Sequence, residues 1–97
     1  MTEPFARPTA LAHVRVTVTD IHRSKAFYQL LLGTDPAIDF SDQVDEPGVR
    51  EDRERFYGGS VFRLGDQVFG LRPVAPAGQT FDPDTVGLDH VSFVVGS

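Results

Sequence analysis

Alternating apolar and polar positions near the start of the chain predict a β-strand. Residues 11–18 read LAHVRVTV and are rich in β-branched side chains, which favour strands. Because successive side chains of a strand point to opposite faces, one face is apolar and the other is polar. The apolar face holds Val14, Val16 and Val18, and the polar face holds His13, Arg15 and Thr17. We expect the valine face to pack into a core.

A helix is predicted directly after this strand. Asp20, preceded by Thr19, can cap the start of a helix over residues 21–32, and Gly33 stands where a left-handed residue ends a helix. Three apolar side chains recur at helical spacing: Phe27, Leu30 and Leu31. We expect this stripe to pack on the valine face of the strand.

The middle of the chain predicts a charged loop and a β-hairpin. Residues 35–40 form a weakly patterned second strand. Residues 42–57 are read as a solvated charged loop, with a lid over a pocket as the alternative. Residues 60–64 and 67–72 flank the dipeptide Gly65-Asp66, which is a two-residue turn signal.

A two-residue turn fixes which residues of the hairpin face each other. Phe62 then opposes Phe69, and Arg63 opposes Val68. The side that faces the helix carries Phe62, Phe69 and Leu71. The open side carries Val61, Arg63, Val68, Gly70 and Arg72. We expect this open side to continue the polar face of the first strand.

Residues 88–95 echo the first strand. They read LDHVSFVV and repeat the leucine, the histidine, the valine after it and the closing valine of residues 11–18. A repeated strand predicts a second module, reached through the proline-rich connector of residues 73–87. Residues 1–10 are predicted to be a flexible lead-in, and residues 11–97 to be a single partial domain.

Composition narrows the class of protein. The 97 residues allow one domain, and 40% hydrophobic residues with eight Phe are typical of a globular chain. No apolar run approaches the ~20 residues of a membrane span, and the N-terminus has no apolar signal region, so we expect a cytoplasmic protein. A formal charge of -5 argues against nucleic-acid and anionic-membrane surfaces. Small molecules or proteins are the expected partners.

The pattern as a whole resembles a known superfamily. The stretch from His13 to Gly33 reads HVRVTVTDIHRSKAFYQLLLG, and it is followed by VFRLGDQVFGLRP and DPDTVGLDHVSFVV. This order is similar to the vicinal oxygen chelate superfamily of glyoxalase, bleomycin-resistance and extradiol dioxygenase relatives. The resemblance implies an α+β fold with a βαβββ module plus the first strand of a second module. Paired modules of this family curve around a cavity, on the face that the strand alternation makes polar.

The resemblance also implies a metal site. It makes His13 and His90 ligands of a divalent ion, Fe, Mn, Ni or Zn, and a two-His-one-carboxylate set would leave positions open for a substrate's oxygens. Gly70 stands where the resemblance would place a glutamate of a glyoxalase-type member, and residues 1–97 do not include the last strand of a second module, from which metal enzymes of the family take a carboxylate. No catalytic acid or base is identified. Without the resemblance, both histidines read as ordinary strand histidines.

Three functions stay open from the sequence. The first is a metal-dependent lyase, isomerase or dioxygenase acting on a small oxygen-rich molecule once a partner completes the site. The second is a metal-free small-molecule binding protein of bleomycin-resistance type, and the third is an incomplete member without activity. For an anionic ligand, the candidate binding residues are Arg15, Arg63 and Arg72. The unpaired edge of strand 88–95 predicts a homodimer.

Overall fold

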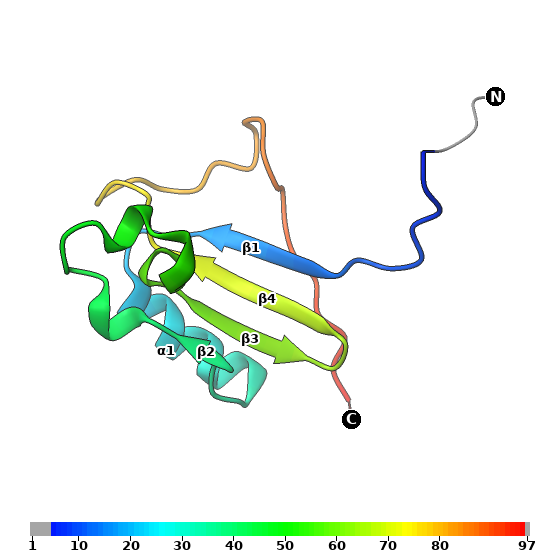
Figure 1. Cartoon of the computed structure of the whole chain (residues 1–97). Helices are drawn as coiled ribbons and strands as arrows, with labels where there is room; N and C mark the ends of the chain where they lie inside the picture. The colour runs from blue at the N-terminus through cyan, green and yellow to red at the C-terminus, as the bar shows by residue number, and fades with distance from the viewer. Residues whose placement is uncertain (1–4, 97) are drawn as a thin grey trace.

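The structure, a computed structural model that describes residues 5–96, has an α+β architecture with one helix and a four-stranded mixed sheet (Figure 1). Residues 1–4 of the predicted lead-in and Ser97 lie outside the described part. The strands are β1 (His13–Thr17), β2 (Ile38–Asp39), β3 (Ser60–Leu64) and β4 (Gln67–Arg72). Helix α1 (Ile21–Leu32) follows β1, and three short 3-10 turns, η1 (Ser41–Gln43), η2 (Val49–Glu51) and η3 (Arg53–Gly58), separate β2 from β3.

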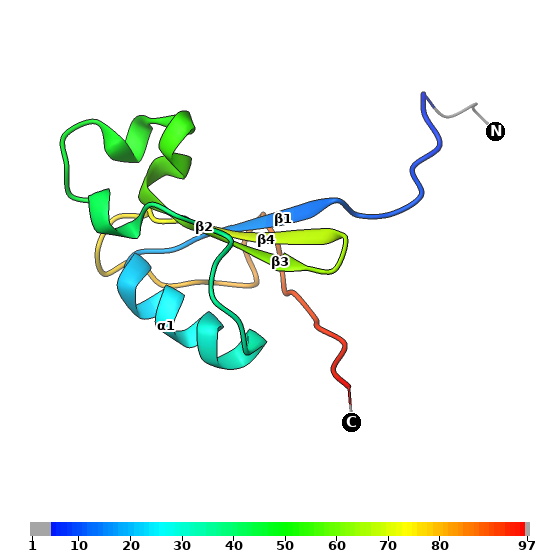
Figure 2. The same ribbon diagram turned by 60° about the horizontal axis from the view of Figure 1, so that its bottom comes forward.

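The sheet has the strand order β1-β4-β3-β2. Strand β1 runs parallel to β4, and the other two pairings are antiparallel. The hairpin register is confirmed, because Phe62 lies opposite Phe69 and Arg63 lies opposite Val68. Figure 2 shows the layers: α1 lies on one side of the sheet, and the 3-10 turns lie on the other side at one end. We call the side without the helix the open face.

Helix α1 begins and ends where the sequence predicts, but the side chains that it buries are not the predicted ones. The Asp20 side chain accepts hydrogen bonds from the backbone N–H groups of His22 and Arg23, and Gly33 ends the helix in the left-handed region at φ 67°. The prediction that Phe27, Leu30 and Leu31 pack on the sheet is wrong, because all three are exposed. The helix residues that contact the core are Ile21, Tyr28 and Leu32. They share one stripe of the helix, at spacings of seven and four residues, and this stripe faces the sheet.

The core lies between α1 and the sheet. Its buried side chains are Ile21, Val44, Phe62, Phe69 and Leu71, and Val14, Val16 and Val18 pack against them partly buried, as the alternation in the first strand predicts. Val44 lies in residues 42–57, which the sequence predicted to be a solvated charged loop. That segment therefore folds against the domain through its few apolar residues while its charges stay outside.

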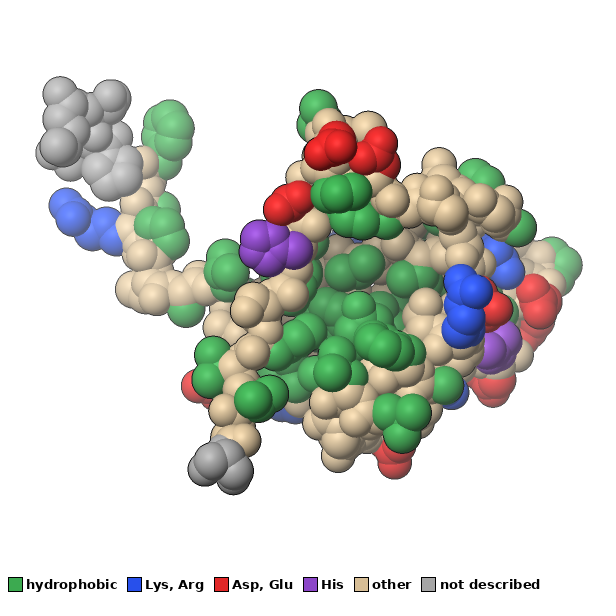
Figure 3. Space-filling view, turned by 180° about the vertical axis from the view of Figure 1, so that it is seen from behind, with side chains coloured by type: hydrophobic (Ala, Val, Ile, Leu, Met, Phe, Trp, Pro, Cys, Tyr) green, Lys and Arg blue, Asp and Glu red, His purple; other side chains and the backbone are tan. Residues whose placement is uncertain are grey.

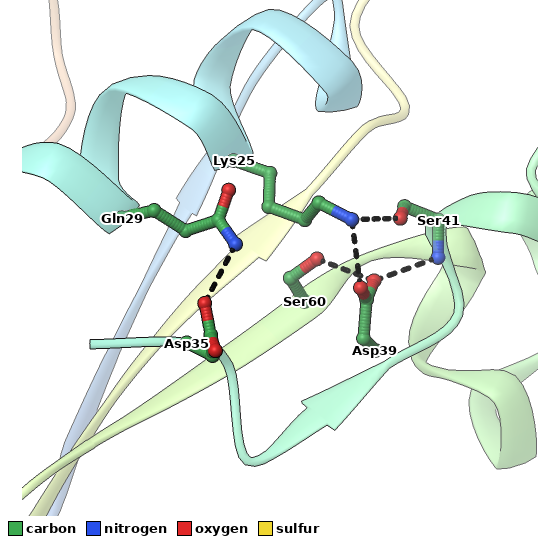
Figure 4. A network of polar contacts seen from close by, with 6 residues as sticks. All are labelled: Lys25, Gln29, Asp35, Asp39, Ser41 and Ser60. Atoms are coloured by element: carbon green, nitrogen blue, oxygen red, sulfur yellow. Dashed lines mark hydrogen bonds and ion pairs between the residues drawn. The ribbon is translucent and has the colours of Figure 1, made fainter.

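A polar network ties the edge strand β2 to α1 (Figure 4). Lys25 Nζ lies 2.8 Å from Asp39 Oδ2 and 3.0 Å from Ser41 Oγ, and Ser60 Oγ donates to Asp39 Oδ1 at 2.9 Å. Burial alone would raise the pKa of Asp39. The hydrogen bonds from Lys25, Ser41 and Ser60 outweigh it and lower the pKa from 3.8 to about 2.

The segment after β4 corrects a second prediction. Residues 88–95, expected as the first strand of a second module, form no strand and pair with no backbone neighbour. The segment is held by a side chain instead, because Phe93 packs edge-on against Phe69 with ring centroids 5.5 Å apart. Its apolar alternation matches that of a strand, but a strand also needs a partner for its backbone groups. Within residues 5–96, no helix has the length and apolar character needed to cross a membrane.

Candidate functional site

The open face of the sheet is built from side chains in cross-strand rows. One row runs across three strands from His13 through Val68 to Arg63. The next runs from Arg15 through Gly70 to Val61, and the register places Arg72 opposite Thr17 in the row beyond. Side chains directly opposite each other point to the same face. The three candidate arginines, Arg15, Arg63 and Arg72, therefore share one surface with His13.

The strands of this open face carry arginines and no carboxylates, although the chain as a whole is acidic. The formal charge of the chain is -5, yet β1, β3 and β4 contain no Asp or Glu. The ion pairs of residues 5–96 that involve Lys or Arg use Lys25, Arg50 and Arg55, none of which lies on these strands. The arginines of the open face have no carboxylate partner within the described part of the chain, so their charge is available to an anion.

Tyr57 brings two of these arginines together. The Arg72 guanidinium carbon lies 3.8 Å from the centroid of the Tyr57 ring, and that of Arg15 lies 5.6 Å from it. Both distances are within cation–π range, and the planar guanidinium of Arg72 is close enough to stack. Arg72 Nε is buried and has no hydrogen-bond partner among the described residues. We call Arg15, Tyr57 and Arg72 the arginine–tyrosine cluster.

The backbone that delivers Tyr57 is strained. Phe56 and Tyr57 adopt φ values of 50° and 60°, a left-handed conformation that bulky side chains rarely take. The turn is held by the Tyr57 N–H, which donates to the Asp52 carbonyl at 3.0 Å, and by stacking of Phe56 on Phe40 at 6.1 Å. Strained residues of this kind persist only where the surroundings enforce them, and they concentrate at binding and catalytic sites.

The Arg15 side chain lies beside Gly70. A Cβ atom at Gly70 would meet it at 3.4 Å, at the edge of ordinary van der Waals contact. The resemblance places a metal-ligating glutamate at this position, but Gly70 has no side chain, and the neighbouring side chain is that of Arg15. At this position the sequence favours an arginine-lined surface over a carboxylate ligand.

The two histidines do not form a ligand set in this structure. His13 is exposed on the open face, at β1, the terminal strand of the sheet. His90 lies in the segment that crosses the helix side of the sheet (Figure 2), where its Nδ1 is 2.8 Å from Asp89 Oδ2. Residues 5–96 contain no group of three or more His, Cys, Asp or Glu side chains placed to hold a metal ion. The donors of one described chain therefore do not fit a divalent metal centre.

The sequence predicted the arginines of this site but not its tyrosine. It placed Arg15, Arg63 and Arg72 on one face, and the register puts them there. Arg63 stands in the His13 row and takes no part in the contact with Tyr57. Tyr57 was missed because it lies in the charged segment. One sequence signal could have identified it: two adjacent aromatic residues, Phe56 and Tyr57, are followed by two glycines after a run of charged residues.

Comparison of the chain with protein-family models, with curated proteins and with solved structures finds no match. The likeness to the vicinal oxygen chelate superfamily therefore rests on the sequence motifs alone. The structure itself establishes a mixed four-stranded sheet with one helix, and an open face on which two arginines lie over one tyrosine ring.

Proposed function

We propose that this chain is a βαβββ module of vicinal oxygen chelate type that binds a small oxygen-rich anion on its open face. The arginine–tyrosine cluster carries the proposal. Two guanidinium groups converge on one aromatic ring, on a surface without carboxylates from its strands. This favours the metal-free binding protein over the other two functions, because every group it needs comes from one chain.

The chemistry of the Arg72 guanidinium supports the same proposal. A ligand carboxylate bound at Arg72 would supply acceptor oxygens to the guanidinium, which matches such groups in a planar, two-bond geometry. Arg15, on the neighbouring strand, would add a second positive charge, and the Tyr57 ring holds both side chains in place.

A direct binding measurement tests this proposal. Isothermal titration calorimetry with benzoate and pyruvate, and with uncharged benzamide for comparison, measures affinity for wild type, Arg72→Gln and Arg15→Gln. Arg7→Gln is the matched control, because Arg7 is an exposed arginine of the chain before β1 and lies on none of the strands of the open face. We expect a carboxylate to bind wild type and the control, and Arg72→Gln to bind it at least ~10-fold more weakly, as the loss of a charged hydrogen bond requires. Equal affinity of wild type and Arg72→Gln, or no carboxylate binding, would contradict the proposal.

A second candidate is a divalent-metal-dependent lyase, isomerase or dioxygenase. The position of His13 favours it, because this exposed imidazole stands on the open face in the row of Arg63. The remaining ligands would have to come from outside residues 5–96 of one chain. The test is the metal content of the protein after reconstitution with Fe, Mn, Ni or Zn. About one ion per chain, lost in His13→Ala, would support this candidate, and absence of metal would reject it.

A further inference from the structure

The open face carries side chains that can bind an anion at two separate places. The first is the arginine–tyrosine cluster, where the Arg15 and Arg72 guanidinium groups lie over the Tyr57 ring. The second is the cross-strand row that runs from His13 to Arg63, both of which are exposed. We call His13 and Arg63 the distal pair. Among residues 5–96, no carboxylate forms an ion pair with Arg63.

The geometry of the sheet separates the two places. Arg63 stands two strands and one row away from Arg15, and one strand and two rows away from Arg72. From the usual strand spacing of about 4.8 Å and an advance of about 6.7 Å per row, the Cα atoms lie about 12 Å and about 14 Å apart. Both separations exceed the Debye length, which is about 8 Å at physiological ionic strength. A single carboxylate held at the cluster therefore gains little from Arg63.

The surface between the two places is apolar. On β4, which lies between β1 and β3, Val68 stands in the row of the distal pair and Gly70 stands in the row of Arg15. Val61 continues the Gly70 row on β3. Both valines are partly buried, and Gly70 has no side chain. Apolar surfaces with a few polar groups at defined positions are typical of small-molecule sites. The open face thus has a group of anion-binding side chains at each end of an apolar strip.

The opposite side of the molecule has a different chemistry. Figure 3 shows hydrophobic side chains gathered in a hollow on the side seen from behind the view of Figure 1. Such a hollow suits an uncharged apolar molecule, because moving a carboxylate out of water without a partner is costly. A ligand with charge at both ends is better served by the open face.

We propose that the ligand of the open face is an elongated dicarboxylate, with one carboxylate at the arginine–tyrosine cluster and the other at the distal pair. This inference rests on the anion binding proposed above and adds a second charge and a length to the ligand. Arg63 binds the second carboxylate in the planar, two-bond geometry of guanidinium–carboxylate pairs. The His13 imidazole offers a further N–H donor. The hydrocarbon body of the ligand lies along the apolar strip.

Three ligands of equal chain length test this inference. Octanedioate has two carboxylates, its monomethyl ester has one, and its dimethyl ester has none. Isothermal titration calorimetry at low ionic strength measures their affinities for wild type, Arg72→Gln and Arg63→Gln. We expect wild type to bind octanedioate about 5-fold more tightly than the monomethyl ester, which is the size of one exposed ion pair. Arg63→Gln should remove this advantage, and Arg72→Gln should weaken the binding of both carboxylates.

Two controls complete the test. Arg7→Gln should bind all three ligands as wild type does, because Arg7 is exposed and lies before β1. Butanedioate is too short to span the strip, so its affinity should not change in Arg63→Gln. Circular dichroism checks that each variant is folded, as expected for exposed Arg63.

The outcomes separate this inference from the proposed function. Equal affinity of octanedioate and its monomethyl ester, or an advantage that survives in Arg63→Gln, would overturn the dicarboxylate and leave single-anion binding at Arg72 standing. Failure of every carboxylate to bind would overturn both. Equal binding of the dimethyl ester would place the ligand in the apolar hollow, and equal losses in Arg7→Gln would show that net charge alone matters. Either result would also overturn the inference.

Discussion

The carboxylate of Asp39 should make the stability of this fold depend on pH in a defined window. Asp39 accepts hydrogen bonds from Lys25, Ser41 and Ser60, and its pKa is lowered from 3.8 to about 2. A pKa that is lower in the folded state means that the ionised form stabilises the fold. That contribution is complete above the unfolded pKa near 4. It is lost as pH falls from about 4 through about 2.

The size of the effect follows from the shift and from the exposure of the group. One pKa unit corresponds to about 1.4 kcal/mol, so the shift from 3.8 to about 2 sets a ceiling of roughly 2.5 kcal/mol. The Asp39 side chain is 32% exposed and that of Lys25 is 25% exposed, so solvent screens the pair. A realistic contribution after this screening is about 1 kcal/mol.

The change that isolates this contribution is Asp39→Asn, which removes the charge and keeps the shape. Urea unfolding of wild type and variant at several pH values between 7 and 2 gives the difference in their free energies of unfolding. We expect this difference to fall by about 1 kcal/mol between pH 5 and pH 2. Asp35→Asn is the matched control, because the exposed Asp35 accepts a hydrogen bond from the neutral Gln29 amide. Parallel pH curves for wild type and Asp39→Asn would refute the reasoning.

Two further changes test the packing. Gly59→Ala should destabilise the fold by about 3 kcal/mol, because the new Cβ would overlap the Leu71 carbonyl oxygen. Thermal unfolding measures this against Gly96→Ala, whose Cβ meets nothing within 4 Å. Equal melting temperatures would contradict the clash. Phe93→Ala removes the ring that packs on Phe69 and should cost about 1 kcal/mol. Limited proteolysis should then cut the C-terminal segment faster while the sheet stays intact, and an unchanged rate would contradict its anchoring role.

Helix α1 and the β3–β4 hairpin could be predicted from the sequence because a few neighbouring residues determine where each begins, ends or turns. Asp20 and Gly33 mark the ends of α1 by their own side chain and backbone chemistry. The Gly65-Asp66 turn fixed the hairpin register, and with it the face of every β3 and β4 side chain. The three arginines of the open face could be located from the sequence for this reason.

Tertiary contacts decided the rest. The apolar stripe through Phe27 and Leu31 resembles a core face, but the helix residues that contact the core are Ile21, Tyr28 and Leu32. The alternation of residues 88–95 is that of a strand, yet no neighbouring backbone pairs with it. Tyr57 reaches the arginines through a strained turn whose left-handed φ values no local propensity favours.

The most direct test of the binding proposal uses Tyr57 itself as the reporter. The chain has no Trp and two Tyr, so Tyr28→Phe leaves Tyr57 as its only tyrosine. Benzoate absorbs with tyrosine, so acetate and pyruvate are the titrants. We predict that one of them changes the fluorescence of Tyr57 in a saturable way, and that the response disappears when Arg72→Gln is added. A Tyr57 signal that ignores both carboxylates, or that responds equally without Arg72, would contradict an anion site on the open face.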